Sequence, residues 1–199
     1  MKLLTPKLYC GANCEDLGIG LRKIREKYPK AQIVGTGVSL GGILLSRYLI
    51  EEGKNSVVDV AVLISVPWDL QAGCSNMEIS GLNMALNVHL TRSLITLVKE
   101  HEDLLKPLSQ INYQEVISSR NLREFDQRFT IKMWGFNSVN DYYADASNKG
   151  KLDSIRIPTL CINAADDMFC PVEGMSLSPV ISNVCPAILS IWSYEKRDK

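Results

Sequence analysis

The chain has 199 residues, 46% of them hydrophobic, and its 22 basic side chains are balanced by 22 acidic ones. This length fits a single globular domain, and zero formal net charge argues against the strongly basic face that is usual in nucleic-acid binding. No apolar run approaches the roughly 18 residues that span a bilayer, and the first residues lack the apolar core of a signal peptide. We therefore expect a folded protein without a nucleic-acid partner, and the chain by itself is typical of a soluble cytoplasmic protein.

The six cysteines, at positions 10, 14, 74, 161, 170 and 185, form neither a CxxC pair nor a Cys/His pattern with metal-ligand spacing. We therefore expect buried or reduced thiols and no disulfide framework. The sequence indicates no metal site and implies no organic cofactor.

The N-terminal part of the chain predicts a helix, a strand and a second helix. Residues 14–27 match a helix that Asn13 caps, with acidic residues in its first turn. The apolar stripe of this helix consists of Leu17, Leu21 and Ile24. The apolar run 31–38 is typical of a buried strand. A Gly-rich turn follows, and a second helix is expected over 43–52, where Gly53 closes it.

Three further apolar segments complete the expected sheet. Strands are predicted over 57–66, which ends before Pro67, over 157–164 and over 187–192. Apolar strands that alternate with helices are typical of a parallel sheet covered on both faces. The predicted fold class is therefore α/β.

A long helical segment interrupts the strand pattern. Residues 82–105 predict a long amphipathic helix, and residues 121–129 a shorter one. The expected apolar stripe of the long helix consists of Leu82, Leu86, Leu90, Leu94, Leu97 and Leu104. We expect a core over 1–69, a helical cap insertion over 70–150, and a return to the core over 151–199. A lid over a site and a purely structural decoration fit this pattern equally well.

The most informative motif is Gly37-Val38-Ser39-Leu40-Gly41, which matches G-x-S-x-G. It lies where a predicted strand turns into a helix, the context in which this motif forms a nucleophile elbow. We expect Gly37 and Gly41 to let strand and helix approach closely, so that Ser39 projects its hydroxyl from the carboxyl edge of the sheet. The Leu40 backbone N–H, at the helix N-terminus, would point at a developing oxyanion. An ordinary Gly-rich turn is the weaker alternative, and a phosphate loop is disfavoured because neither phosphate-binding glycine motif is present.

A serine nucleophile needs a general base, and that base needs an acid that orients it. In α/β-hydrolases the acid follows the serine along the chain, and the base follows the acid. Asp167 fits the position of the acid best, and Asp166 is the fallback. The two histidines, His89 and His101, lie on the predicted insertion and precede both aspartates, so neither is assigned as the base. No base histidine is therefore identified in this chain.

Several stretches in the right order resemble the α/β-hydrolase-domain phospholipases and short-chain esterases of the AB hydrolase superfamily, family four. The resembling stretches, between about residue 3 and about residue 177, are Leu3-Leu4-Thr5-Pro6, Asn13-Cys14-Glu15-Asp16-Leu17, Gly37-Val38-Ser39-Leu40-Gly41-Gly42, residues 123–130, residues 141–147 and residues 157–167. The resemblance implies an α/β-hydrolase fold with a helical cap, in which Ser39 is the nucleophile and Asp167 is the acid. This chain would hold the C-terminal half of the parallel sheet, a partial α/β-hydrolase fold.

The sequence departs from the family pattern at both ends. Family members carry a Gly-Gly-His segment after the last strand, whereas here residues 190–194 lead to the charged residues 195–199. The family also has an N-terminal anchor helix, earlier strands and an oxyanion-hole loop that supplies a second donor. We therefore expect a chain truncated at both ends, with an exposed edge at strand 31–38, poor stability on its own and little turnover.

The resemblance implies a serine carboxylic ester hydrolase that acts on acyl lipids, either phospholipids, acylglycerols or short esters, through an acyl-enzyme and without a cofactor. A catalytically inactive isoform or pseudoenzyme that binds lipid or a partner is the alternative. An acyltransferase that uses the same elbow is a third possibility. The family also implies association with the endoplasmic reticulum or another endomembrane, although these residues contain no anchor.

Overall fold

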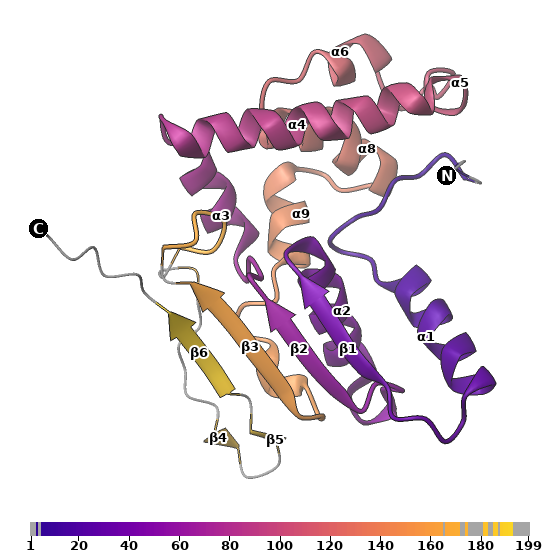
Figure 1. Cartoon of the computed structure of the whole chain (residues 1–199). Helices are drawn as coiled ribbons and strands as arrows, with labels where there is room; N and C mark the ends of the chain where they lie inside the picture. The colour runs from indigo at the N-terminus through magenta and orange to yellow at the C-terminus, as the bar shows by residue number, and fades with distance from the viewer. Residues whose placement is uncertain are drawn as a thin grey trace, which may run out of the picture. The chain divides into compact units, whose positions relative to one another are not determined.

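The computed structural model of the chain describes residues 3, 5–164, 166–171, 174, 181–182, 185–186 and 188–192, the last three ranges by their backbone. The chain divides into two compact units. A helical unit comprises Met1–Cys10 and Cys74–Ala144, and a sheet unit comprises Gly11–Gly73 and Asp145–Lys199. Figure 1 shows the elements of both units. The first ten residues thus group with the helices, which the sequence did not predict.

The sheet unit contains a parallel sheet of four strands in the order β1-β2-β3-β6. The strands are β1 (Val34–Val38), β2 (Val60–Ile64), β3 (Thr159–Ala164) and β6 (Ile188–Trp192). All four predicted strands are present, and their parallel pairing confirms the predicted α/β class. A separate antiparallel pair is formed by β4 (Ile181–Ser182) and β5 (Cys185–Pro186).

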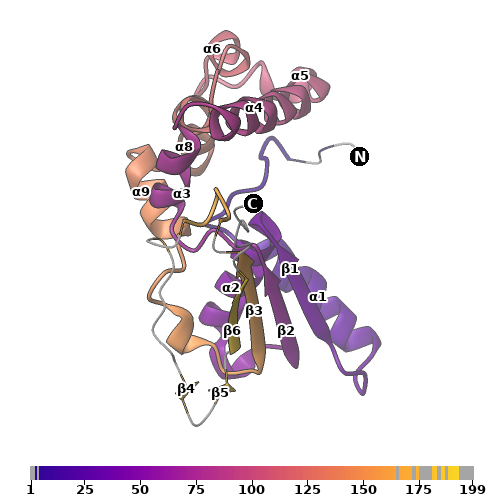
Figure 2. The same cartoon turned by 60° about the vertical axis from the view of Figure 1, so that its left-hand side comes forward.

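Two helices pack in the sheet unit, α1 (Glu15–Lys27) and α2 (Leu40–Glu52), and a short 3-10 turn η1 (Gly53–Asn55) follows α2. The helix α2 packs against β1 and β2 on one face of the sheet (Figures 1 and 2). The N-cap of α1 is Cys14 rather than Asn13, although the Asn13 side chain accepts a hydrogen bond from the Glu15 N–H at 3.1 Å. The helix α2 begins at Leu40, earlier than predicted, so that it follows Ser39 directly.

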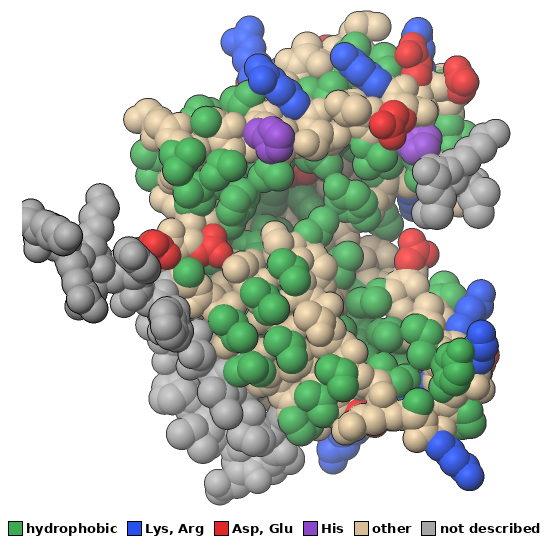
Figure 3. Space-filling model, in the orientation of Figure 1, with side chains coloured by type: hydrophobic (Ala, Val, Ile, Leu, Met, Phe, Trp, Pro, Cys, Tyr) green, Lys and Arg blue, Asp and Glu red, His purple; other side chains and the backbone are tan. Residues whose placement is uncertain are grey.

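In the part of the chain that the structure describes, helices cover only one face of the sheet, which differs from the expected cover on both faces. Ala61 and Leu63 of β2 are buried on the side of α2, whereas Val34 and Val38 of β1 are 57% and 55% exposed. β1 is an edge strand among the described strands, so it is not the buried strand that its composition predicted. Figure 3 shows apolar side chains at the surface over the opposite face of the sheet. Because the described helices pack on a single face, alternate residues of the apolar strands stay accessible.

The helical unit is formed mostly by short helices around one long helix, α4. The elements that follow β2 are α3 (Leu70–Met77), α4 (Leu82–Glu100), α5 (Glu102–Leu105), α6 (Tyr113–Ile117), α7 (Leu122–Phe125), the π-helical segment η2 (Asp126–Thr130), α8 (Ile131–Trp134) and α9 (Val139–Ala146), before the 3-10 turn η3 (Leu152–Ser154). The predicted helix over 82–105 is thus interrupted at His101, and that over 121–129 changes to π geometry at Asp126.

The buried face of α4 is not the predicted leucine stripe. Its buried residues are Asn87, Thr91, Ile95 and Val98, whereas Leu82 is 66% exposed. Asn87 is buried because it bridges two segments: its Nδ2 donates to the Met77 carbonyl and its Oδ1 accepts from the Leu122 N–H. Apolar spacing identified the helix but not its inward face, since buried polar side chains with partners also occupy that face.

A polar cluster lies inside the helical unit at the π segment. The Asp126 carboxylate accepts hydrogen bonds from the Thr130 hydroxyl at 2.6 Å and from the Tyr143 hydroxyl at 2.8 Å. Tyr143 also contacts the Cys74 thiol at 3.2 Å, and the Arg123 guanidinium lies over the Tyr143 ring. Burial raises the pKa of Asp126 to about 6 even though both hydroxyl bonds lower it. Burial therefore makes the Asp126 carboxyl group hold its proton more tightly than an exposed aspartate does.

Candidate active site

Ser39 lies between the end of β1 and the start of α2 in a strained backbone conformation. Its φ of 51° and ψ of −121° lie in a region that residues with a side chain rarely adopt. The Ser39 N–H donates to the Ile64 carbonyl at 3.0 Å, while the Ser39 carbonyl accepts from the Gly42 N–H at 2.9 Å. Ser39 is exposed. The strand therefore ends in a sharp turn that presents a serine side chain at the carboxyl edge of the sheet.

Two glycines make this turn possible, and the second is not the glycine that the sequence motif suggested. A Cβ on Gly37 would lie 2.7 Å from the Gly42 Cα and 2.8 Å from the Gly41 carbonyl oxygen. A Cβ on Gly42 would clash with the Cγ2 atom of Val66. A Cβ on Gly41 would meet no atom within 4 Å. The close approach of strand and helix therefore requires Gly37 and Gly42, and not Gly41 as the motif suggested.

Leu40 is the first residue of α2, and its position determines what its amide can do. The N–H groups in the first turn of a helix have no acceptor within the helix, and the helix dipole makes this end positive. An amide immediately after the nucleophile in this setting can donate to an oxyanion that forms on a bound ester. The described geometry is thus compatible with the oxyanion role predicted for Leu40.

Asp167 follows the carboxyl end of β3 in a tight turn. Its Oδ1 accepts a hydrogen bond from the Phe169 N–H at 2.9 Å, and its own N–H donates to the Ala164 carbonyl at 3.3 Å. Asp166 is exposed, whereas Asp167 is half-buried. Because β1 and β3 are parallel to β2 between them, Ser39 and Asp167 follow the same edge of one sheet. The structure thus brings the predicted nucleophile and the predicted acid to one edge.

The histidines belong to the other unit. His89 is exposed on α4, and His101 lies at the break between α4 and α5, so both are in the helical unit. Ser39 and Asp167 are in the sheet unit. Residues 193–199, where the family pattern would place the base, lie outside the described residues.

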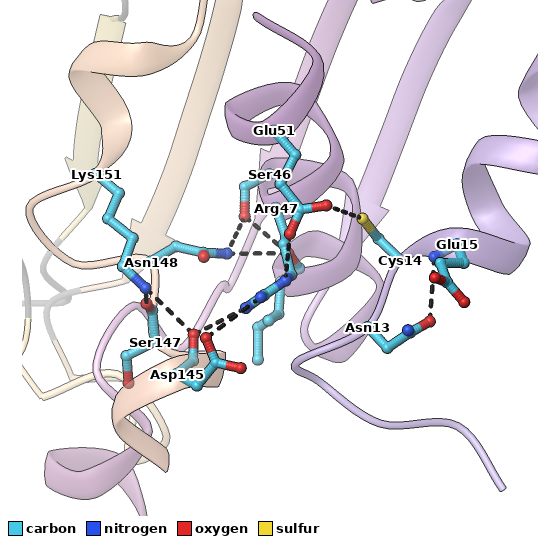
Figure 4. A network of polar contacts seen from close by, with 11 residues as sticks. Asn13, Cys14, Glu15, Ser46, Arg47, Glu51, Asp145, Ser147, Asn148 and Lys151 are labelled. Carbon is cyan, nitrogen blue, oxygen red and sulfur yellow. Dashed lines mark hydrogen bonds and ion pairs between the residues drawn. The ribbon is translucent and has the colours of Figure 1, made fainter. Parts of the chain in front are cut away.

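A polar network anchors the C-terminal half of α2, the helix that follows the elbow (Figure 4). Arg47 forms an ion pair with Glu51 at 2.7 Å and donates to the Asp145 carbonyl at 2.8 Å. The Cys14 thiol donates to Glu51 at 3.2 Å. Burial, together with the Glu51 carboxylate, raises the pKa of Cys14 to about 12, so this thiol is neutral and unreactive at physiological pH. The network fixes α2 against α1 and against the C-terminal end of α9.

Sequence reasoning missed one residue of the sheet edge, Asn163. This carboxamide is 1% exposed near the carboxyl end of the apolar strand β3, donates to the Val66 carbonyl at 3.0 Å and accepts from the Trp68 indole at 3.3 Å. The available signal was an Asn inside an otherwise apolar run, because a buried amide needs partners that strand pairing does not supply.

The described residues contain no group of three or more His, Cys, Asp or Glu side chains that could hold a metal ion. Within the same residues no helix is both long and apolar enough to cross a bilayer.

A strained serine between a parallel strand and a helix, with close-packed glycines on both sides, is the backbone arrangement found at the nucleophile elbow of α/β-hydrolases. No family model matches the chain. Among curated proteins, phospholipase ABHD3 from Mus musculus is 40% identical over 182 residues, which cover 91% of this chain and 44% of that protein. The putative esterase YheT from Escherichia coli is 32% identical over 163 residues, covering 82% of this chain and 48% of that protein. The chain belongs to the α/β-hydrolase family that includes these proteins.

A further relative is the medium-chain fatty acid ethyl ester synthase/esterase 2 of Saccharomyces cerevisiae, 29% identical over 208 residues that cover 94% of this chain and 46% of that protein. The chain spans less than half the length of these relatives, 44%, 48% and 46%. Solved structures are more distant: an esterase of Pyrococcus furiosus has a TM-score of 0.46 and 16% identity, over 94% of this chain and 54% of that one. The family assignment therefore rests on the sequence relatives and on the elbow.

Proposed function

We propose that this chain carries the nucleophile-bearing part of a serine carboxylic ester hydrolase that acts on acyl lipids, either phospholipids, acylglycerols or short- to medium-chain esters. The observation that carries the proposal is the strained Ser39 between β1 and α2. Strain of this kind costs roughly 1–3 kcal/mol and clusters at active sites. The relatives include a phospholipase, a monoacylglycerol lipase and a putative esterase by name, which supports an acyl-ester substrate.

In the proposed reaction the Ser39 hydroxyl oxygen attacks the ester carbonyl carbon while a general base removes the hydroxyl proton. The Leu40 N–H donates to the oxygen that becomes negatively charged. When the tetrahedral intermediate collapses, the alcohol leaves with the proton and an acyl-Ser39 ester remains. Water then attacks this ester, which releases the carboxylic acid product and restores the Ser39 hydroxyl. Asp167 accepts a hydrogen bond from the imidazole of the base, orients the ring and stabilises the positive charge that the ring acquires with the Ser39 proton.

The general base of this reaction is not assigned to a residue of this chain. The sequence has no histidine after Asp167, and we assign the role to neither His89 nor His101. A second candidate is an inactive member of the family that binds lipid or a partner, since we assign no side chain of these 199 residues as the base. A serine without its base is a weak nucleophile, so we expect low turnover from residues 1–199 by themselves.

Labelling with a fluorophosphonate separates the two candidates. The folded chain is treated with the probe, with and without imidazole, which replaces the missing general base in solution. We expect an adduct on the peptide that contains Ser39, faster in imidazole and absent from Ser39→Ala. A folded chain without an adduct in either condition favours the binder.

Two further points of the proposal have separate tests. An acyltransferase would use the same elbow with another acceptor, and the yeast relative is named both a synthase and an esterase. Supplying ethanol and measuring ethyl ester formation against free acid distinguishes transfer from hydrolysis. Membrane association is proposed from the family resemblance, and co-flotation with phosphatidylcholine vesicles tests it.

A further inference from the structure

We propose that Asn163 is a positioning residue of the elbow, which holds Val66 against the first turn of α2 and thereby sets the direction of the Leu40 amide. The proposal concerns a residue outside the predicted nucleophile, acid and oxyanion donor. Its meaning for catalysis rests on the proposed function, whereas its geometry does not.

The first step is the bridge that Asn163 makes from β3 to the segment after β2. Its Nδ2 donates to the Val66 carbonyl at 3.0 Å, and its Oδ1 accepts from the Trp68 indole N–H at 3.3 Å. All three residues are buried. A buried carbonyl or indole that loses its partner carries a desolvation cost, so this bridge has no inexpensive substitute. The carboxamide therefore fixes the path of the chain directly after β2.

The second step is the contact between Val66 and α2. Val66 is completely buried, and its Cγ2 occupies the space that a Cβ on Gly42 would need. The Gly42 N–H in turn donates to the Ser39 carbonyl at 2.9 Å. Val66 thus lies directly against the turn of helix that holds the strained serine, and a displaced Val66 would allow this turn to move.

A second strained serine lies in the same segment. Ser65 has a φ of 49°, and its N–H donates to the Ile162 carbonyl at 2.8 Å. The equivalent bond in the neighbouring strand joins the Ser39 N–H to the Ile64 carbonyl at 3.0 Å. Both strained residues persist only where the surroundings over-determine them. Asn163 supplies that constraint next to Ser65, because it binds the Val66 carbonyl directly after the hydrogen bond from the Ser65 N–H to the Ile162 carbonyl.

The bridge also connects the predicted acid to the nucleophile. Asp167 follows the strand that contains Asn163, and its N–H is bonded to the Ala164 carbonyl. A shift of β3 would therefore reach both the acid turn and, through Val66, the elbow. This arrangement predicts that the elbow and the end of β3 loosen together when the bridge is broken.

The test is native-state hydrogen exchange of the full chain, which reports local opening without requiring any activity. Asn163→Asp keeps the shape and an acceptor for Trp68 but removes the donor to Val66. We expect the Ser39, Gly42 and Ile43 amides to exchange about 10-fold faster or more than in the unchanged chain. The Gly18 amide of α1 should exchange as before.

Matched variants keep the test decisive. Thr159→Ala perturbs a buried polar residue at the opposite end of β3 and should leave the elbow amides unchanged relative to α1. Val66→Ala removes the contact with Gly42 but keeps the backbone carbonyl, and should reproduce the faster elbow exchange even if Asn163→Asp does not fold. If exchange accelerates equally in α1 and at the elbow, in both Asn163→Asp and Val66→Ala, the proposal is overturned. Faster elbow exchange in a chain whose Ser39 is never labelled would refute the proposed function and leave the positioning role intact.

Discussion

Alanine at Gly37 and alanine at Gly41, two positions in one motif, should have opposite effects on stability. At Gly37 the new Cβ would lie 2.7 Å from the Gly42 Cα, 2.8 Å from the Gly41 carbonyl oxygen and 2.9 Å from the Gly42 nitrogen. Ordinary contacts begin at 3.4 Å, so strand and helix must separate by about 0.7 Å, the difference between 3.4 and 2.7. All three obstructing atoms belong to the backbone, and no side-chain rotation can relieve the clash.

Overpacking of this kind costs roughly 1–3 kcal/mol, and a purely backbone clash belongs at the upper end. Gly37→Ala should therefore lower the free energy of unfolding by about 3 kcal/mol. Gly41→Ala meets no atom within 4 Å and replaces a helical glycine, so it should raise that free energy by up to about 1 kcal/mol.

Urea denaturation of both variants and the unchanged chain, followed by circular dichroism, measures the two differences. The slope against urea should stay the same, so that the midpoint reports stability alone. Similar midpoints for the two variants, or a more stable Gly37→Ala, would refute the steric account of the elbow.

Three further predictions concern side chains in strained or buried positions. Because glycine adopts positive φ freely, Ser39→Gly should be more stable than Ser39→Ala by about 1 kcal/mol in the same urea assay, and equal stability would argue against strain at this residue. Asp126 binds its proton more tightly when folded, with a pKa of about 6 against 3.8, so its contribution is fully present below about pH 4 and is lost as pH rises through 6. Subtracting the pH profile of Asp126→Asn from that of the unchanged chain should reveal this loss, at most about 3 kcal/mol, and a flat difference would contradict it. Since its pKa is raised to about 12, Cys14 should resist iodoacetamide at pH 8 until the chain is unfolded, and rapid modification of native protein, located by peptide mapping, would count against the buried pairing with Glu51.

The sequence was sufficient for the sheet and for the location of the elbow. Apolar strands that alternate with helices predicted the parallel strands, and the position of Ser39 between a strand and a helix predicted the strained turn. These features depend on local patterns, which a single sequence carries.

Features that depend on tertiary partners were missed or wrongly predicted. Nothing local distinguishes Gly41 from Gly42, because the need for glycine arises from Val66, a residue distant in sequence. The inward face of α4 includes Asn87, whose burial depends on partners at Met77 and Leu122. Hydrophobic spacing assigns burial to apolar residues alone and cannot anticipate such bridges.

The most direct test of the central claim is to trap the acyl-enzyme. The folded chain is mixed with a medium-chain p-nitrophenyl ester in imidazole, quenched in acid after a short time and digested for mass spectrometry. We expect an acyl group on the peptide that contains Ser39, and none at this site in Ser39→Ala, because the elbow presents this hydroxyl and the added imidazole takes its proton. A folded chain that remains unacylated at Ser39 across substrate and imidazole concentrations would contradict the claim that this elbow carries an ester hydrolase nucleophile.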